Sequence, residues 1–343
     1  MVSGGESVSN QETLSTKGFS LVEMLVTVAL CSVVMGSVLE LFRQGVNMHS
    51  ASMQRAEMQQ NARVALNLMA QDFSMASTGF VDGGIQLPTG DGSTNPKRGC
   101  SSSSCGTWDY LTDDRLYAIT PGDGVGPMVG GSATDMVTLV YRDPDLTTLS
   151  AATVAGVNST GTQITTQAGG TASIQAKDVL MLCNSLGCAA GVVTSVDSGA
   201  DQIHFADSDS LSYNQSSIEV GNIKAISNSG VFPPTTAYRI FVISYFVETS
   251  TMRLMRQVSS HPPVPVAEIV ENLQITYDTF DDATLAATSN LPTAGGVPNQ
   301  IRKVNISINV RSAQPETRNG RYDRFAAKTS VSIRNLSFND RYV

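Results

Sequence analysis

One acidic residue, Glu23, lies inside an otherwise apolar stretch near the start of the chain. No charged residue follows it from Met24 to Leu39, and Glu40 and Arg43 then end the run. A run of this length approaches the ~20 apolar residues with which a helix crosses a bilayer. Because a carboxylate in lipid is costly, by about 2.5–3.5 kcal/mol on insertion scales, its presence there indicates a function.

Four of the five cysteines form two local pairs with the same spacing, Cys100 with Cys105 and Cys183 with Cys188. Each pair encloses a short loop of turn-forming residues. In an exported domain such pairs are expected to form two local disulfides. A zinc site built from both pairs is the alternative, although zinc knuckles usually have a spacing of two residues. The fifth cysteine, Cys31, lies within the apolar run and is expected to serve packing.

Other residue types that could carry chemistry are scattered. The histidines His49, His204 and His261 are isolated, and the sequence contains neither a nucleophile elbow nor a Walker-type phosphate loop. The acidic clusters at 207–209 and 278–282 could offer oxygen ligands to Ca²⁺, but they lack the spacing of a calcium loop. Turn formation is the expected role of both clusters. We therefore expect no catalytic residue, no cofactor and no metal site.

The composition narrows the class of protein. The chain has 343 residues and a formal net charge of -8, which argues against a general nucleic-acid binder because such a protein needs a basic face. Charged residues make up 15% and aromatic residues 6% of the chain. With abundant Ser, Thr, Gly and Ala, these values favour an exported domain rich in strands and loops.

A helical pattern runs without proline from Phe19 to about Ser77. The first half is apolar all round. In the second half apolar residues recur every three or four positions, which predicts one stripe packed against a soluble domain. The stripe consists of Met58, Ala62, Ala65, Met69 and Phe73, and the opposite face has Gln59, Arg63, Asn67 and Gln71.

Strand patterns follow a loop-rich region at 79–134. We expect strands at 135–142, 177–183, 191–196, 202–205, 238–248, 252–256, 270–278, 301–311 and 326–335. The short turn after Glu248 predicts a hairpin of 238–248 with 252–256. The strict alternation of 301–311 predicts pairing with the strand before it. The polar segment 146–176 is expected to form thin edge strands or a mobile insertion.

The segment Gly18-Phe19-Ser20-Leu21-Val22-Glu23 resembles the N-terminal signal of type IV prepilins and of the pseudopilins of type II secretion. The resemblance implies that a prepilin peptidase cleaves between Gly18 and Phe19 and that the new amine of Phe19 is methylated. It also implies that Glu23 recruits subunits into a filament. There its carboxylate can meet the N-terminal ammonium of a neighbouring subunit, and two charges costly in an apolar bundle satisfy each other in one register. An ordinary signal anchor with a tolerated glutamate is the alternative.

A second resemblance is to the PilW-type minor pilins. It rests on the helix end Arg55–Phe73, where Asn-Ala-Arg-x-Ala-Leu leads to an acidic residue. It rests also on a tyrosine-containing strand followed by Leu254-x-Arg256, on the segment Val270–Tyr277, and on a closing strand that ends in Arg-Asn. The J-type pseudopilins share a looser form of the helix end. Residues 79–235 match no family.

The expected fold is α+β: a long N-terminal helix, membrane-spanning in its first half, packs on an antiparallel β-sheet headgroup with loop-rich insertions. The expected divisions are a leader at 1–18, the helix at 19–77 and the headgroup at 78–343. The resemblances imply a minor pilin in the priming or tip complex of a type IV pilus. Such a chain sits in the inner membrane with a periplasmic headgroup and then moves to the pilus on the cell surface.

The implied partners are other major and minor pilins, the prepilin peptidase and the inner-membrane assembly platform, with no nucleic acid. Two alternatives remain open beside the pilus subunit. One is a J-like pseudopilin of a type II secretion system. The other is a tip adhesin or binding module formed by residues 79–235. A membrane-anchored enzyme is a more distant alternative.

Overall fold

The computed structural model describes residues 18–89, 96–99, 115–126, 128–129, 131–145, 156–227, 235–293, 298–315 and 320–339. The chain divides into two compact units, residues 1–53 and residues 54–343, and the second unit is called the head. Most of the expected leader, and both Cys100 and Cys105, lie outside the described residues.

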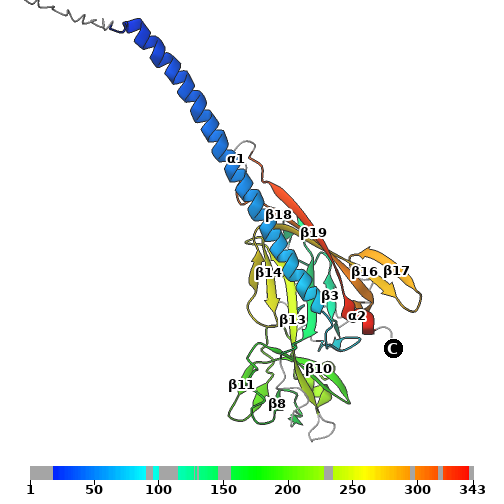
Figure 1. Cartoon of the computed structure of the whole chain (residues 1–343). Helices are drawn as coiled ribbons and strands as arrows, with labels where there is room; N and C mark the ends of the chain where they lie inside the picture. The colour runs from blue at the N-terminus through cyan, green and yellow to red at the C-terminus, as the bar shows by residue number, and fades with distance from the viewer. Residues whose placement is uncertain are drawn as a thin grey trace, which may run out of the picture. The chain divides into compact units, whose positions relative to one another are not determined.

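The first long element is the helix α1, Leu21–Met75, which confirms the expected helix (Figure 1). In its N-terminal half, residues 21–53, every side chain up to Ser50 is exposed. The apolar run gives this half a mean hydropathy of 2.2 in its best window, so the helix is long and apolar enough to cross a membrane. The absence of proline lets the backbone hydrogen bonds continue without interruption.

The C-terminal half of α1, residues 54–75, belongs to the head and buries one face. Each member of the expected stripe is buried, and Leu66 and Asp72 are buried with it. The four residues expected on the opposite face, Gln59, Arg63, Asn67 and Gln71, are exposed. The three-to-four spacing therefore identified the packed face correctly.

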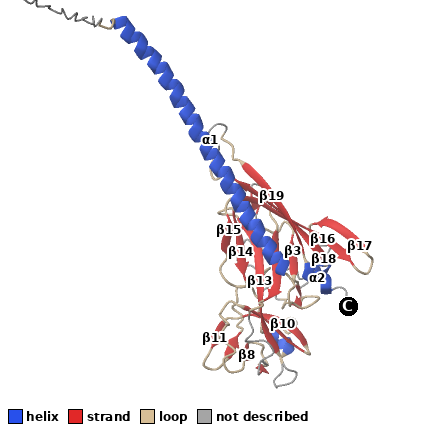
Figure 2. Ribbon diagram, viewed as in Figure 1, coloured by secondary structure: helices blue, strands red, loops and turns tan. Residues whose placement is uncertain are grey.

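Antiparallel strands make up most of the head, as Figure 2 shows in red. The largest sheet contains β3 (Ile119–Gly122), β6 (Met136–Arg142), β9 (Val179–Asn184), β10 (Gly187–Val192), β13 (Thr236–Glu248), β14 (Arg253–Val258) and β15 (Val264–Ala267). The central strand is β13: it pairs with β6 on one edge and with β9 and then β14 on the other. The expected hairpin is β13 with β14.

A four-stranded sheet follows in the order β17 (Ala286–Leu291), β16 (Val270–Asp281), β18 (Ile301–Arg311) and β19 (Arg324–Ser332). The pairing of β18 with β16 confirms the pairing expected for 301–311. The expected final strand ends too late, because Arg334 and Asn335 begin a short helix, α2 (Arg334–Asn339). Pairing of β19 with β18 already stops at Ser332 opposite Lys303.

A smaller sheet joins β7 (Gly156–Val157), β8 (Gln163–Thr165), β11 (Ser195–Asp197) and β12 (Gln202–His204). The strand expected at 191–196 is wrong, because this apolar run covers the end of β10 and the start of β11. The chain turns after Val193, which still pairs with Asp178 at the end of the β9–β10 hairpin, whereas the backbone of Thr194 bonds to His204. The polar segment 156–176 does contain only thin strands.

Short elements complete the described part of the head. They are β1 (Ile85–Gln86), β2 (Arg115–Leu116), β4 (Met128–Val129), β5 (Ser132–Ala133) and the 3-10 helices η2 (Ile223–Ile226) and η4 (Pro298–Gln300). These short strands agree with the expected loop-rich character of 79–134.

Two apolar cores share one strand. On β9, Val179 and Met181 face the main core, in which the stripe of α1 also lies. The alternating residues Leu180 and Leu182 face a second core beneath the small sheet. A strand buried on both faces must be apolar throughout, which explains why 179–182 is a continuous apolar run instead of an alternating one. The small sheet lies at the end of the head remote from β19 (Figure 1).

Candidate functional site

The expected processing and assembly residues lie at the start of the described chain. Gly18 and Phe19 precede α1, and Glu23 lies in its first turn. All three residues are exposed, with Phe19 at 80%. Within the described part of the chain, no ion pair involves Glu23.

A second carboxylate on the same helix has the opposite environment. Asp72 is only 4% exposed, and four donors surround it. Its Oδ2 accepts hydrogen bonds from Nε of Arg256 at 2.7 Å and from the hydroxyl of Tyr245 at 2.5 Å. Its Oδ1 accepts from Nη2 of Arg256 at 3.1 Å and from the hydroxyl of Tyr141 at 3.4 Å. We call these four residues the Asp72 cluster.

Strand register brings the partners of Asp72 together. Tyr245 on β13 lies directly opposite Arg256 on β14. Tyr141 on β6 lies opposite Phe241, four residues before Tyr245, so the two tyrosines project from the same face of the sheet. Three strands thus contribute one donor residue each to a single carboxylate on the helix.

Burial and the neighbouring charges determine the protonation states of the residues that contact Asp72. Burial raises the pKa of Tyr141 to about 12, and the charge of Asp72 adds to the shift. The same two causes raise the pKa of Tyr245. Burial alone would lower the pKa of Arg256, but its hydrogen bond with Asp72 and the charge of Asp72 raise it above the ordinary value. The phenols therefore remain neutral donors and the guanidinium remains charged.

Polar contacts also hold both ends of the C-terminal half of α1. Near its start, Nε of Arg55 lies 2.9 Å from Oδ2 of Asp323. Near its end, Nδ2 of Asn335 donates to the carbonyl of Ala76 at 3.1 Å and to Oγ1 of Thr78 at 2.7 Å. The carbonyls that end a helix lack intrahelical donors, so this amide acts as a side-chain cap. This contact explains why Asn335 lies in α2 and not in a strand.

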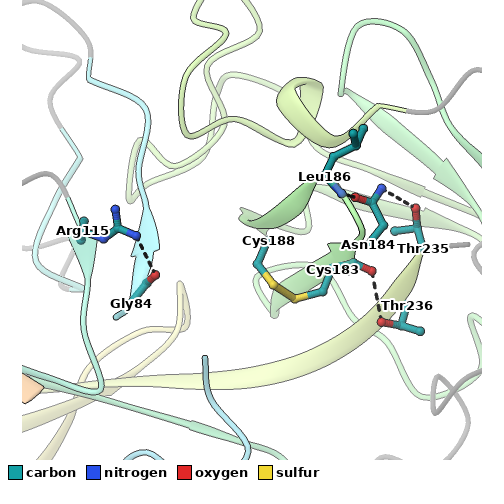
Figure 3. Close-up of a disulfide and its surroundings, with 8 residues drawn as sticks. All are labelled: Gly84, Arg115, Cys183, Asn184, Leu186, Cys188, Thr235 and Thr236. Carbon is teal, nitrogen blue, oxygen red and sulfur yellow. Dashed lines mark hydrogen bonds between the residues drawn. A yellow bond between two sulfur atoms is a disulfide. The ribbon is translucent and has the colours of Figure 1, made fainter. Parts of the chain in front are cut away.

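The cysteine pair in the described region lies on the β9–β10 hairpin. Cys183 and Cys188 face each other across the two strands, with their Cα atoms 4.2 Å apart, and a disulfide joins them (Figure 3). Next to it, Nδ2 of Asn184 donates to the hydroxyl of Thr235 at 3.0 Å, and its Oδ1 accepts from the backbone of Leu186 at 2.9 Å. These contacts fix the hairpin turn.

The acidic clusters organise turns. Asp209 accepts hydrogen bonds from the backbone of Leu211, Tyr213 and Asn214. Asp281 accepts them from the backbone and the hydroxyl of Thr284. Turn formation, expected from the sequence, is therefore what these carboxylates do.

The three histidines lie in separate elements: His49 in α1, His204 in β12 and His261 in the turn after β14. Of these, His261 has its Nε2 atom 3.2 Å from Oδ1 of Asp178. Across the described ranges, no three residues of the types His, Cys, Asp and Glu come together as a metal site.

The sequence patterns did not predict the contacts of the Asp72 cluster. The resemblance pointed to an acidic residue at the end of the helix and to Arg256, but not to their pairing. A signal was present, because Asp72 lies between Met69 and Phe73 on the stripe that was expected to be apolar. A carboxylate on a packed face needs a partner, and a search for that partner would have led to the sheet.

Comparison with known proteins finds a similarity at the start of the chain. Residues 14–39 match the family described as the prokaryotic N-terminal methylation motif. No curated protein and no solved structure matches the chain. The matched segment includes Gly18, Phe19 and Glu23, and it ends with the apolar run. The chain thus carries the signal of a type IV pilin-like or pseudopilin protein, which is a structural subunit that associates with other pilins.

Proposed function

We propose that this chain is a minor subunit of a type IV pilus, acting in its priming or tip complex. The observation that supports the proposal is how the surroundings of the side chains change along α1. The methylation motif leads into about thirty exposed, mostly apolar positions, and the same helix then buries a stripe in the head. Such a helix needs a lipid bilayer first and neighbouring helices afterwards, because water is a poor solvent for its N-terminal half.

Processing prepares the helix for assembly. Cleavage after Gly18 and methylation of Phe19 would leave an ammonium close to the start of α1. In the filament this group would meet Glu23 of a neighbouring subunit, and the pairing would select one register of subunits. The chain would wait in the inner membrane with its head in the periplasm until the assembly platform draws it into the filament. Its partners there are major and minor pilins.

The size of the head supports a minor subunit over a major one. The head extends from residue 54 to residue 343 and includes both the main core and the second core beneath the small sheet. A head of this bulk packs poorly at every position of a helical array. It fits a place at or near the end of the filament, where fewer neighbours surround it.

The proposal is tested with a matched pair of glycine variants in cells that assemble filaments. In Gly18→Leu the cleavage site is lost, so the chain should keep its leader and remain in the membrane fraction. In Gly36→Ala the new Cβ meets no atom within 4 Å, so processing and incorporation should continue. Immunoblots of membrane and sheared-filament fractions give the result. Wild-type levels of Gly18→Leu in sheared filaments would contradict the proposal.

Deletion of the whole gene separates the pilus from the secretion pseudopilus. A pilus subunit predicts loss of surface filaments with normal protein secretion. Accumulation of secreted enzymes in the periplasm with normal filaments would instead favour a J-like pseudopilin. Both outcomes are read from the same strain by electron microscopy and by assay of culture supernatants.

A binding role at the tip is the second candidate, and one feature of the head favours it. A groove of about 570 Å³ lies between the disulfide hairpin and the loop before η2. Two apolar side chains on its walls, Leu186 and Val220, are 60% and 58% exposed. The double variant Leu186→Ser/Val220→Ser should reduce adhesion with normal piliation if the groove binds a surface. Normal adhesion by this variant would remove the candidate.

A further inference from the structure

The stripe that α1 presents to the head repeats along the helix. Its apolar members recur every three or four residues, and they are small or flexible side chains for the most part. A slide of the helix by one turn, about 5.4 Å, would put Ala62 where Met58 lies and Phe73 where Met69 lies. The same slide would put Leu66 and Met69 where the fully buried Ala62 and Ala65 lie, although methionine can adapt to irregular gaps. The stripe therefore opposes a slide through packing alone, without any charged contact.

Asp72 is the one charged residue that α1 buries among its described side chains. In the observed register its two oxygens receive four donors from three strands. After a slide of one turn, either Leu68 or Ala76 would occupy its position. The side chain of Arg256 would then lose its carboxylate, and Asp72 would be buried without donors. Only one register satisfies both charges.

A single buried polar contact of this kind can select one alignment of helices at the expense of stability. We propose that the Asp72 cluster is a register lock, which fixes the axial position and rotation of the C-terminal half of α1 on the sheet. Apolar burial supplies the attraction between helix and sheet, and the cluster adds to the selection of the alignment. The lock concerns contacts within the head alone, so it stands or falls independently of the role in a pilus.

The other polar contacts of this half of the helix favour the observed register less strongly. The side chain of Arg55 is 61% exposed in its ion pair with Asp323, and exposed pairs contribute little. Asn335 contacts the carbonyl of Ala76 and the hydroxyl of Thr78, and an uncharged amide loses less than a buried ion pair when its contacts are broken. The Asp72 cluster is the buried and charged contact of this half of the helix.

Engineered cysteines can report the register in the full-length chain in detergent micelles. In a Cys31→Ser background, Arg55→Cys with Asp323→Cys marks the native register, because these side chains touch. Ala51→Cys or Gln59→Cys with Asp323→Cys marks a slide of one turn in either direction. A short bismaleimide joins the cysteines, and mass spectrometry of the linked peptides gives the ratio of slipped to native products.

The deciding variant replaces the cluster with apolar residues of similar size: Asp72→Leu, Tyr141→Phe, Tyr245→Phe and Arg256→Met. Because no charge remains buried, we expect the thermal midpoint of the variant to stay close to that of the parent chain. The ratio of slipped to native products should rise from below about 1 in 100 to at least about 1 in 10. Exclusively native products would overturn the proposal, because the apolar stripe would then set the register alone.

Two further variants complete the test. Arg253→Met with Glu268→Leu removes an exposed ion pair nearby, at 3.1 Å, and should leave the native products unchanged. If the fourfold variant does not fold, the isosteric Asp72→Asn variant carries the test. It keeps the size of the side chain but loses the charge that Arg256 needs, so slipped products are expected there as well. Their absence from Asp72→Asn would equally overturn the register lock.

Discussion

Glu23 and Asp72 are carboxylates on one helix, and their environments are opposite. Glu23 is exposed and has no ion pair within the described part of the chain, whereas Asp72 is buried and has four donors. Asp72 finds its partners within its own chain because the head supplies three strands at that point. Glu23 lies in a half of the helix whose described side chains are exposed up to Ser50, and in the proposed pilus its partner would be the N-terminal ammonium of another subunit.

The helix α1 therefore serves two purposes. In the proposed pilus, Glu23 in the N-terminal half of α1 would pair with another subunit. In the C-terminal half, Asp72 is bonded to residues of its own head. A substitution in the first half should therefore change assembly without changing the stability of the head. A substitution in the second half should change the stability of the head first.

The largest effect is expected for Glu23→Ala. Loss of the carboxylate leaves the N-terminal ammonium of the neighbouring subunit unpaired, so incorporation into filaments should fall by at least about 100-fold, which corresponds to about 3 kcal/mol. Quantitative immunoblots of sheared filaments measure the loss. The thermal unfolding of the head should not change.

The matched control is Glu40→Ala, which removes the other carboxylate of the same half of the helix. Its incorporation should remain within a small factor of wild type. Equal losses for the two variants would contradict a specific role of Glu23, because any charge on the helix would then have the same effect.

The next effect is expected for Asp72→Ala. Removing one partner of a buried ion pair leaves Arg256 uncompensated, so the free energy of unfolding should fall by about 3–5 kcal/mol. Urea unfolding followed by tyrosine fluorescence measures it. The control is Glu57→Ala on the exposed face of the same helix, for which a change within about 0.5 kcal/mol is expected. A loss below about 1 kcal/mol for Asp72→Ala would show that the cluster contributes little.

A smaller effect is expected in the distal part of the head. Replacing Cys183 and Cys188 together by serine opens a loop with a sequence separation of 5, which costs about 2 kcal/mol in the loop-closure estimate. Hydrogen exchange of the β9–β10 hairpin should show the loss locally. Ser185→Ala, within the same loop, serves as the control and should leave exchange unchanged. Faster exchange in the β18–β19 pair as well would contradict a local role for the disulfide.

The smallest effect is a dependence on alkaline pH. The pKa of tyrosine in an unfolded chain is about 10, and that of Tyr141 in the fold is raised to about 12. Between these values the unfolded chain has lost a proton that the folded chain retains, so stability is complete below pH 10 and falls as the pH rises toward 12. In Tyr141→Phe this fall should become shallower. Identical pH profiles of urea midpoints for the variant and wild type would show that Tyr141 titrates normally.

Much of the fold could be predicted because its patterns are long and local. The helix extends over 55 residues, its packed face repeats regularly, and the β13–β14 and β16–β18 pairs join strands that lie close in the sequence. The motif around Gly18 could be identified for the same reason, since its residues are adjacent. Local patterns of this kind are visible before any tertiary contact is known.

The rest depended on contacts between distant segments. Asp72 lies 184 residues from Arg256, and only the strand register brings Arg256 and the two tyrosines to one point. The break between β10 and β11 accompanies the bond of Thr194 to His204, and the helical turn at Asn335 accompanies its contact with the end of α1. Each of these features is set by a partner that the local sequence does not contain.

The most direct test of the central claim is mass spectrometry of the intact N-terminal peptide from membrane and sheared-filament fractions. A peptide that begins at methylated Phe19 is expected in the sheared-filament fraction. A chain that still begins at Met1, in cells that process their other prepilins, would contradict that claim and leave an ordinary anchored domain.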